Sequence, residues 1–354
     1  MPRPIRAVIH LQSLEHNLSV IRQNIGAAKI WSVLKADAYG HGIHRVWRGL
    51  KNTDGFAVLD LHEAILLREE GWEGPILLLE GFFQQEDLQV IDQYQLTTSV
   101  HSHWQLTAIE QATLHQPLSV YIKLNSGMNR LGFTTEEYVS VVSKLQSMAN
   151  VKNVTLMSHF ANSDIPSGIE QPLQKIMQFD GLHLNTCIAN SGAVLWHKNT
   201  HYDWVRAGIV LYGASPSGKW SDIEKYNLQA AMSLQSEIIA IHEIQAGESI
   251  GYGSKFTTTK PMRIATVACG YADGYPRHAP SGTPVWCNGM RCSLLGAVSM
   301  DMLTIDISDC PDAKLGSLVE LWGQNIPVDD VAEAAGTIGY ELLCALARRV
   351  PIDF

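Results

Sequence analysis

Lys35 stands where its amine could act as a nucleophile. Residues 29–34 form a mostly apolar run that predicts a buried strand, and Lys35 follows it directly. Residues 36–42 include two glycines, which let backbone approach a ligand closely. A partly desolvated lysine loses its proton more readily, and the neutral amine can form a Schiff base. For an isolated lysine, a charged end that reaches solvent from a strand would be the simpler explanation.

Three other side chains are suited to binding an anion or transferring a proton. Arg130 could bind a carboxylate through two parallel N–H groups. Lys123 precedes it on a predicted strand, and two unmodified cations side by side would repel each other. Tyr252 lies between two glycines that predict a tight, exposed loop. A tyrosine needs help, such as a nearby cation, to act as a base at neutral pH, and a turn tyrosine is the plainer explanation of this motif.

Eight apolar runs in the first two thirds of the chain must position these residues. They predict strands at residues 29–34, 56–59, 76–79, 96–100, 118–124, 154–159, 182–188 and 203–209. Amphipathic helical patterns lie between them, for example at residues 61–70 and 136–148. Eight strands, each paired with a helix, predict a (β/α)8 TIM-like barrel.

Several polar residues fall at or just past the carboxyl ends of these predicted strands. They are Lys35, Lys123, His159, Asn190, Ser191 and Arg206. Barrel enzymes build their active sites on this face, so we expect these side chains to meet there. Taken alone, Asn190 and Ser191 are better explained as turn residues, and His159 is about equally well explained as a buried structural histidine.

The sequence changes character after about Pro216. Short strand patterns with Gly, Pro and Asn turns follow, at residues 229–244, 262–267, 284–286, 291–295, 302–306 and 318–322, and a helical pattern covers residues 337–348. We therefore predict an α/β fold whose N-terminal barrel, residues 10–222, precedes a mostly β C-terminal domain, residues 223–354. Residues 1–9 could join the second domain.

Composition excludes several classes of protein. The 354 residues carry a net charge of −9, which argues against non-specific binding to nucleic acid or to an anionic membrane. The six cysteines form no CxxC pair and have no zinc-finger spacing, so we expect buried thiols and no metal. No stretch has the length of a membrane span, and no apolar segment follows Arg3 and Arg6 as in a signal peptide. We expect a cytoplasmic protein.

Residues 33–42, Val-Leu-Lys-Ala-Asp-Ala-Tyr-Gly-His-Gly, resemble the segment of alanine racemases that carries pyridoxal 5'-phosphate (PLP). Asp37 stands where many of that family have asparagine, and both residues occur there. Further motifs in the family's order extend the resemblance over almost the entire chain. The chain thus resembles the alanine racemases, which are fold type III PLP enzymes with a barrel and a β domain.

The resemblance implies that Lys35 holds PLP and that a set of other residues surrounds the cofactor. The implied cofactor-binding residues are Tyr39, His159, Asn190, Ser191, Arg206, Gly208, Ile209 and Tyr340. Arg206 would face the pyridine nitrogen, where a cation disfavours a second positive charge and keeps the ring a weak electron sink. His159 would hold this arginine in place, while Ser191 and the backbone of Gly208 and Ile209 would bind the phosphate.

Racemisation needs proton transfer on both faces of the α-carbon, and the family assigns these to Lys35 and Tyr252. Tyr252 would come from the partner subunit, so the resemblance implies a homodimer with shared active sites. The implied substrate-binding residues are Arg130, Met300, Asp301 and Tyr271. In many members of the family the lysine at the position of Lys123 is carbamylated, which would supply an anion beside Arg130.

The expected activity is the interconversion of L-alanine and D-alanine, either to supply peptidoglycan synthesis or to serve alanine catabolism. A related alternative is another fold type III enzyme, such as a broad-specificity racemase or an amino-acid decarboxylase. The cationic pair Arg130 and Lys123 favours retention of the substrate carboxylate over its expulsion. The third alternative is a non-catalytic PLP-binding protein. Such proteins are usually small single barrels without the motifs at residues 251–253 and 300–301.

Overall fold

The computed structural model describes residues 3–354 and divides the chain into two compact units. The barrel unit comprises residues 18–38 and 42–211. The sheet unit comprises residues 39–41 and 212–354 together with the described residues up to Asn17. Each unit is described by itself below.

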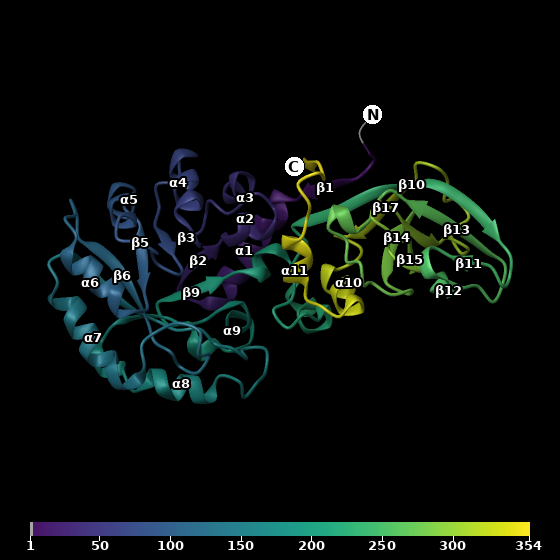
Figure 1. Cartoon of the computed structure of the whole chain (residues 1–354). Helices are drawn as coiled ribbons and strands as arrows, with labels where there is room; N and C mark the ends of the chain where they lie inside the picture. Colours follow the sequence, from purple (N-terminus) through teal and green to yellow (C-terminus); the bar gives the residue numbers. More distant parts are fainter. Residues whose placement is uncertain (1–2) are drawn as a thin grey trace. The chain divides into compact units, whose positions relative to one another are not determined.

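The barrel unit contains a closed ring of eight parallel strands (Figure 1). In ring order they are β2 (Lys29–Val33), β3 (Gly55–Val58), β4 (Ile76–Leu78), β5 (Thr97–Val100), β6 (Leu118–Lys123), β7 (Val151–Met157), β8 (Asn185–Cys187) and β9 (Trp204–Ala207), and β9 pairs with β2. All eight predicted strands and the barrel fold are confirmed. Most residues of these strands are buried, because both faces of a parallel barrel are covered.

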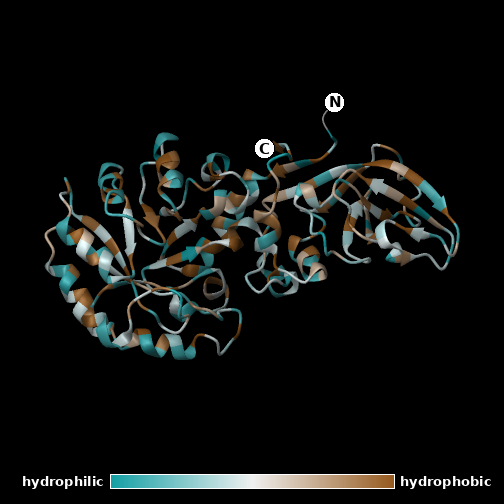
Figure 2. Cartoon of the chain, viewed as in Figure 1, coloured by the Kyte–Doolittle hydropathy of each residue, from teal (hydrophilic) through white to brown (hydrophobic). Residues whose placement is uncertain are grey.

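Helices surround this ring (Figure 1). They are α3 (Ile43–Gly49), α4 (Leu61–Glu69), α5 (Asp87–Gln93), α6 (His103–Gln111), α7 (Thr135–Ser147), α8 (Glu170–Met177) and α9 (Ser191–Trp196), while α1 (Leu11–Ile25) has residues in both units. Helix α7 is amphipathic: Tyr138, Val141 and Leu145 are buried on one side, and most of its other residues are hydrophilic (Figure 2). A capping box of Thr134 and Glu137 begins it.

Aromatic side chains fill part of the barrel interior. The rings of Trp31 and Trp204 stack with centroids 4.3 Å apart. The indole N–H of Trp31 donates to the hydroxyl of Tyr121 at 3.0 Å, which satisfies a buried donor. This packed layer makes the barrel a rigid support for the residues at its carboxyl end.

The segment after β2 is a left-handed helical turn, α2 (Lys35–Tyr39). Ala36, Asp37, Ala38 and Tyr39 have φ of 56°, 52°, 54° and 53°. The glycines of this segment predict a close approach of backbone to a ligand. The positive φ of four residues with side chains is an additional feature that only the structure shows. Such a conformation costs roughly 1–2 kcal/mol per residue, so surrounding contacts must hold it in place.

The sheet unit is built on one eight-stranded, mostly antiparallel sheet, as the predicted β character requires. Its order is β13 (Met262–Val267), β16 (Leu303–Asp306), β15 (Met290–Leu295), β14 (Pro284–Cys287), β17 (Leu318–Trp322), β10 (Met232–Ile244), β1 (Arg6–Ile9) and β18 (Ile352–Asp353). A separate pair consists of β11 (Ser249–Ile250) and β12 (Phe256–Thr257).

Two helices of this unit differ from the predicted pattern. Helix α10 (Val328–Ala335) was not predicted, and α11 (Gly339–Cys344) is shorter than the predicted helix at residues 337–348. The predicted end was wrong because the Ala347 N–H donates to the carbonyl of Asp273, outside any helical ladder. The expectation of buried cysteines holds for five of the six, since Cys344 is exposed. No helix within residues 3–354 combines the length and the hydrophobicity that a membrane span needs.

Candidate active site

The carboxyl end of the barrel gathers the polar residues that the sequence placed there. Lys35 follows β2, Lys123 is the last residue of β6, His159 follows β7, and Arg206 lies within β9. A small pocket at this end is lined in part by Lys123, Arg130 and His159. The structure therefore brings these candidates from separate strands onto one face of the barrel.

Arg206 is buried, and its guanidinium is fixed by backbone carbonyls. One terminal nitrogen donates to the Cys187 carbonyl at 2.7 Å, and the other donates to the Ser158 carbonyl at 2.6 Å. Carbonyl groups satisfy its N–H donors without cancelling its charge. Arg206 is thus a positive charge held in a single orientation.

His159 interacts directly with this arginine. Its Nδ1 accepts a hydrogen bond from the second terminal nitrogen of Arg206 at 3.2 Å, which requires a neutral ring at that nitrogen. Burial, followed by the charges of Arg206 and Arg130, holds the pKa of His159 well below its usual range. His159 is therefore a neutral acceptor that adds no charge to the site.

Lys123 is only 8% exposed, and its ammonium donates to the Leu79 carbonyl at 3.5 Å. Burial lowers its pKa from 10.5 to about 8, and the charges of Arg206 and Arg130 add to this effect. At pH 7 an amine with that pKa is neutral in roughly one molecule in ten. A buried lysine so disposed can react as a free amine at neutral pH.

Arg130 is exposed on a loop whose backbone is well defined. The Asn125 side-chain carbonyl accepts from the N–H groups of Gly127 and Asn129, and the Phe133 N–H donates to the Lys123 carbonyl. The bonds of Asn125 lie within the loop, and the bond from Phe133 ties the end of the loop to the last residue of β6. The guanidinium is consequently presented beside Lys123 at the pocket.

The residues predicted to bind a phosphate lie after the last two barrel strands, next to a further candidate, Asn190. The side-chain Oδ1 of Asn190 accepts from the Ala193 N–H at 3.2 Å and caps helix α9. The Ser191 hydroxyl accepts from the Gly208 N–H at 2.9 Å, so these two candidates are neighbours. Ile209 is fully buried next to them in the chain.

Tyr39 and Tyr340 lie together in the sheet unit, with ring centroids 6.0 Å apart. Tyr39 also packs against Tyr212 at 4.7 Å. Burial raises the pKa of the Tyr39 phenol, and Tyr340 adds to the shift. The Tyr39 phenol therefore keeps its proton and can donate a hydrogen bond.

Tyr252 is 77% exposed, between Gly251 and Gly253 with φ of 69° and 71°. Side chains with a Cβ rarely adopt such angles, so the glycines are needed to make this loop. The ring of Tyr252 therefore projects into solvent from a tight loop of the sheet unit.

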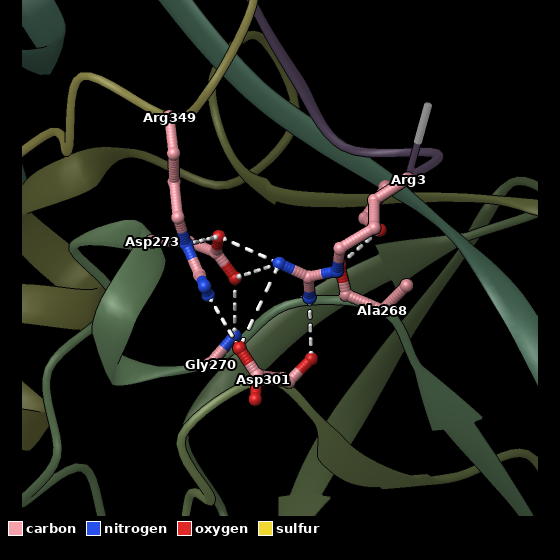
Figure 3. A network of polar contacts seen from close by, with 7 residues as sticks. Arg3, Ala268, Gly270, Asp273, Asp301 and Arg349 are labelled. Atoms are coloured by element: carbon pink, nitrogen blue, oxygen red, sulfur yellow. Dashed lines mark hydrogen bonds and ion pairs between the residues drawn. The ribbon is translucent and has the colours of Figure 1, made fainter. Parts of the chain in front are cut away.

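Four charged residues form an ion-pair network beside the loops that carry Tyr271 and Met300 (Figure 3). The fully buried Asp273 accepts from Arg3 at 2.9 Å, from Arg349 at 2.7 Å and from the Gly270 N–H at 2.9 Å. Arg349 also bridges to the Asp301 carboxylate at 2.7 Å, and Arg3 donates to the Asp301 carbonyl at 2.6 Å. The Asp301 side chain is therefore already bound within its own unit.

The same two loops are joined by backbone hydrogen bonds. The Tyr271 N–H donates to the Ser299 carbonyl and the Ala272 N–H to the Met300 carbonyl, each at 3.0 Å. The roles of Arg3 and Arg349 could not be predicted from the sequence, because no local pattern links residues so far apart. Their only signal is that each is a cation near one end of the chain.

Comparisons with known proteins agree along the whole chain. The family models described as "Alanine racemase, N-terminal domain" and "Alanine racemase, C-terminal domain" match residues 9–216 and 231–354. An alanine racemase of Erwinia tasmaniensis is 56% identical and covers 100% of this chain and 99% of its own. A catabolic alanine racemase of Salmonella typhimurium is also 56% identical, with 99% of both chains covered.

A solved structure agrees with these relatives. The biosynthetic alanine racemase of Pseudomonas aeruginosa superimposes with a TM-score of 0.94, at 42% identity, over 99% of both chains. The alanine racemase of Acinetobacter baumannii superimposes with a TM-score of 0.93, at 40% identity and over 99% of both chains. Sequence and fold thus point to one group of proteins.

Proposed function

The chain belongs to the alanine racemase family, and from this premise we propose that it interconverts L-alanine and D-alanine with PLP bound to Lys35. The observation that carries the proposal is the cluster of cations at the carboxyl end of the barrel. Lys123 and Arg206 are buried there, and burial, followed by the charge of Arg206, lowers the pKa of Lys123.

The residues present fit an anionic cofactor. A buried group of cations is stable only with anions to offset it, and a phosphate and a substrate carboxylate are such anions. Ser191 and Gly208 lie at the end of the last two barrel strands, where barrels commonly hold phosphate. The Ser191 oxygen accepts from the Gly208 N–H, which leaves the serine O–H to donate to a phosphate. Tyr39 and Tyr340 would add hydroxyl groups, and Asn190 would hold Ser191 in place.

When bound, PLP withdraws electrons and makes the α-hydrogen of alanine acidic. Lys35 would carry the cofactor and, once the substrate has taken its place, would hold or release a proton at Nζ on one face. Tyr252 would do the same at its hydroxyl oxygen on the other face. Its exposure of 77% supports a partner subunit as the place where it acts, and hence a homodimer with shared sites.

Arg206 would face the pyridine nitrogen as a fixed charge. A guanidinium has no lone pair to accept a proton, and its charge opposes a second cation beside it. Neutral His159 supports this arrangement, because it accepts from Arg206 without adding charge. The site would favour return of the proton to the α-carbon of the substrate over side reactions such as transamination.

Arg130 would bind the substrate carboxylate, with Met300, Asp301 and Tyr271 contributed by the partner subunit. Because the Asp301 carboxylate accepts from Arg349, its role would be to fix the position of the neighbouring Met300 backbone. We propose a cytoplasmic enzyme whose D-alanine either enters peptidoglycan or arises in alanine catabolism. Relatives named catabolic and biosynthetic are both similar to this chain.

An assay of the purified protein tests this proposal directly. With added PLP, L-alanine and D-alanine should each be converted to the other until the two concentrations are equal. A panel of other L- and D-amino acids should react more slowly, and carbon dioxide release would reveal a decarboxylase. Protein that carries PLP on Lys35 but racemises no amino acid would overturn the proposal.

Replacing Arg206 by glutamate should slow racemisation and increase transamination. The carboxylate would favour a proton on the pyridine nitrogen, and loss of a charged hydrogen-bonding group should slow racemisation by roughly ten- to a hundredfold. Transamination of alanine yields pyruvate and the amine form of the cofactor, so pyruvate per racemisation turnover is the measurement. Arg206→Lys keeps the charge and should leave this ratio low. Equal ratios in both variants would contradict the assignment.

Carbamylation of Lys123 should depend on pH in a defined direction. Only the neutral amine reacts with carbon dioxide, giving a carbamate and a proton. With a pKa of about 8, the neutral fraction rises steeply between pH 6 and pH 8. Carbon-13 NMR with labelled bicarbonate should show a carbamate signal that grows over this window. The signal should be missing in Lys123→Ala, whose reduced activity small carboxylates should partly restore.

A further inference from the structure

The left-handed turn after Lys35 has backbone donors that it cannot satisfy itself. The first N–H groups of any helical turn lack carbonyl partners within the turn. The Ala38 N–H reaches back to the Leu34 carbonyl at 2.7 Å. The Asp37 N–H, one residue earlier, is bound instead by a side chain from another element, the Glu63 carboxylate at 3.1 Å.

Glu63 uses both carboxylate oxygens on separate backbone segments. One oxygen accepts from the Asp37 N–H, and the other accepts from the Leu59 N–H at 3.0 Å. Leu59 comes directly after β3, the strand that pairs with β2 in the barrel. The carboxylate therefore ties the turn that follows one strand to the end of the neighbouring strand.

The position of Glu63 is itself fixed. It lies in the first turn of helix α4, where the side chain of the N-cap residue Asp60 accepts from the Glu63 N–H at 3.0 Å. The far side of the left-handed turn has a second anchor, because the Asp37 side chain accepts from the Ile43 N–H at 2.8 Å. The turn is thus held from both sides by carboxylates.

We propose that Glu63 is a positioning residue for Lys35, acting by bridging the Asp37 and Leu59 N–H groups. This inference rests on the proposed role of Lys35. A left-handed turn of residues with side chains persists only where contacts over-determine it. Asp37 is two residues from Lys35, so release of its N–H lets the turn relax and spreads the positions available to the lysine amine.

Glu63→Gln is the sharpest variant, because the amide keeps the size of the side chain and loses one acceptor. Its NH2 group would face a backbone N–H, so the bridge cannot form intact. The matched control is Glu69→Gln, an exposed residue on the same helix. Leu67→Ala, at a fully buried position of α4, reports what general loosening of the helix would do.

Hydrogen exchange of the protein without PLP is the first measurement. In Glu63→Gln the peptide that spans residues 35–39 should exchange roughly tenfold faster, as expected for a lost charged hydrogen bond. Glu69→Gln should match the wild type. Leu67→Ala should speed exchange throughout α4 and β3 and not selectively at residues 35–39. Unchanged exchange at residues 35–39 in Glu63→Gln would overturn the bridge.

The second measurement is the PLP dissociation constant, which is determined from the absorbance of the bound cofactor. Glu63→Gln should raise the PLP dissociation constant roughly tenfold, while its midpoint of thermal unfolding stays close to that of Glu69→Gln. Faster exchange with unchanged PLP affinity and unchanged kcat would mean that Glu63 only stabilises the fold, which refutes the positioning role. A wild-type protein without PLP on Lys35 would instead overturn the proposed function, and the exchange result would be unaffected.

Discussion

Lys35→Ala should be yellow only while free PLP is present and should have almost no racemase activity. The substitution removes the covalent attachment of the cofactor and one of the two bases. Loss of a positioned base alone costs about 10²–10⁴ in rate. The measurements are racemisation rate and the mass of the protein after borohydride reduction, which should show cofactor fixed to the wild type and none to the variant.

The control is a lysine on the strand that precedes Lys35. Lys29 begins β2, at the opposite end from Lys35, with its ammonium 5.4 Å from the Trp204 ring centre. Lys29→Ala should keep both the borohydride-stable cofactor and the activity. If Lys35→Ala remained fully active, or if reduction fixed PLP to a different lysine, the assignment of the nucleophile would be wrong.

Tyr252→Phe should reduce racemisation by about 10²–10⁴ with little change in stability. The phenyl ring keeps its volume, the residue is exposed, and only the hydroxyl is lost. Exchange of the α-hydrogen with solvent deuterium should continue for one enantiomer, through Lys35, while conversion to the other stalls. Tyr202→Phe, a second exposed tyrosine, should behave like the wild type.

Mixed dimers test whether the site is shared. If Lys35 and Tyr252 of one site come from different subunits, a dimer of Lys35→Ala and Tyr252→Phe chains has one complete site. Random mixing of equal amounts should then restore about one quarter of the wild-type activity. If both residues come from one chain, no mixed dimer has a complete site. A mixture that stays inactive despite proven subunit exchange would refute the shared site.

The barrel could be predicted because each of its strands is marked locally. Runs such as residues 76–79 and 118–124 are apolar, short and bounded by turns, and the structure has strands at both. The alternation of strands and helices along the chain predicts parallel strands, and parallel strands share a carboxyl edge. This places Lys123 and Arg206 at one end of the barrel. The chemical roles came from the resemblance and stay proposals.

The left-handed turn could not be predicted in this way. Ala36 and Ala38 have no local preference for positive φ, and the contacts that hold the turn come from Glu63 and Ile43. The network of Arg3, Asp273 and Arg349 is equally hidden, because its members are distant in sequence. The turn and the network both depend on tertiary contacts, which cannot be predicted from the local pattern of a single sequence.

Strand β1 has a consequence for the order in which the chain can fold during synthesis. It pairs with β10 and with β18. The ribosome makes β10 roughly 220 residues after β1, which takes on the order of ten to forty-five seconds. All eight barrel strands are made within that interval. The barrel can therefore fold while the apolar β1 still lacks both neighbours, and a nascent chain stalled before Met232 would expose this edge to aggregation.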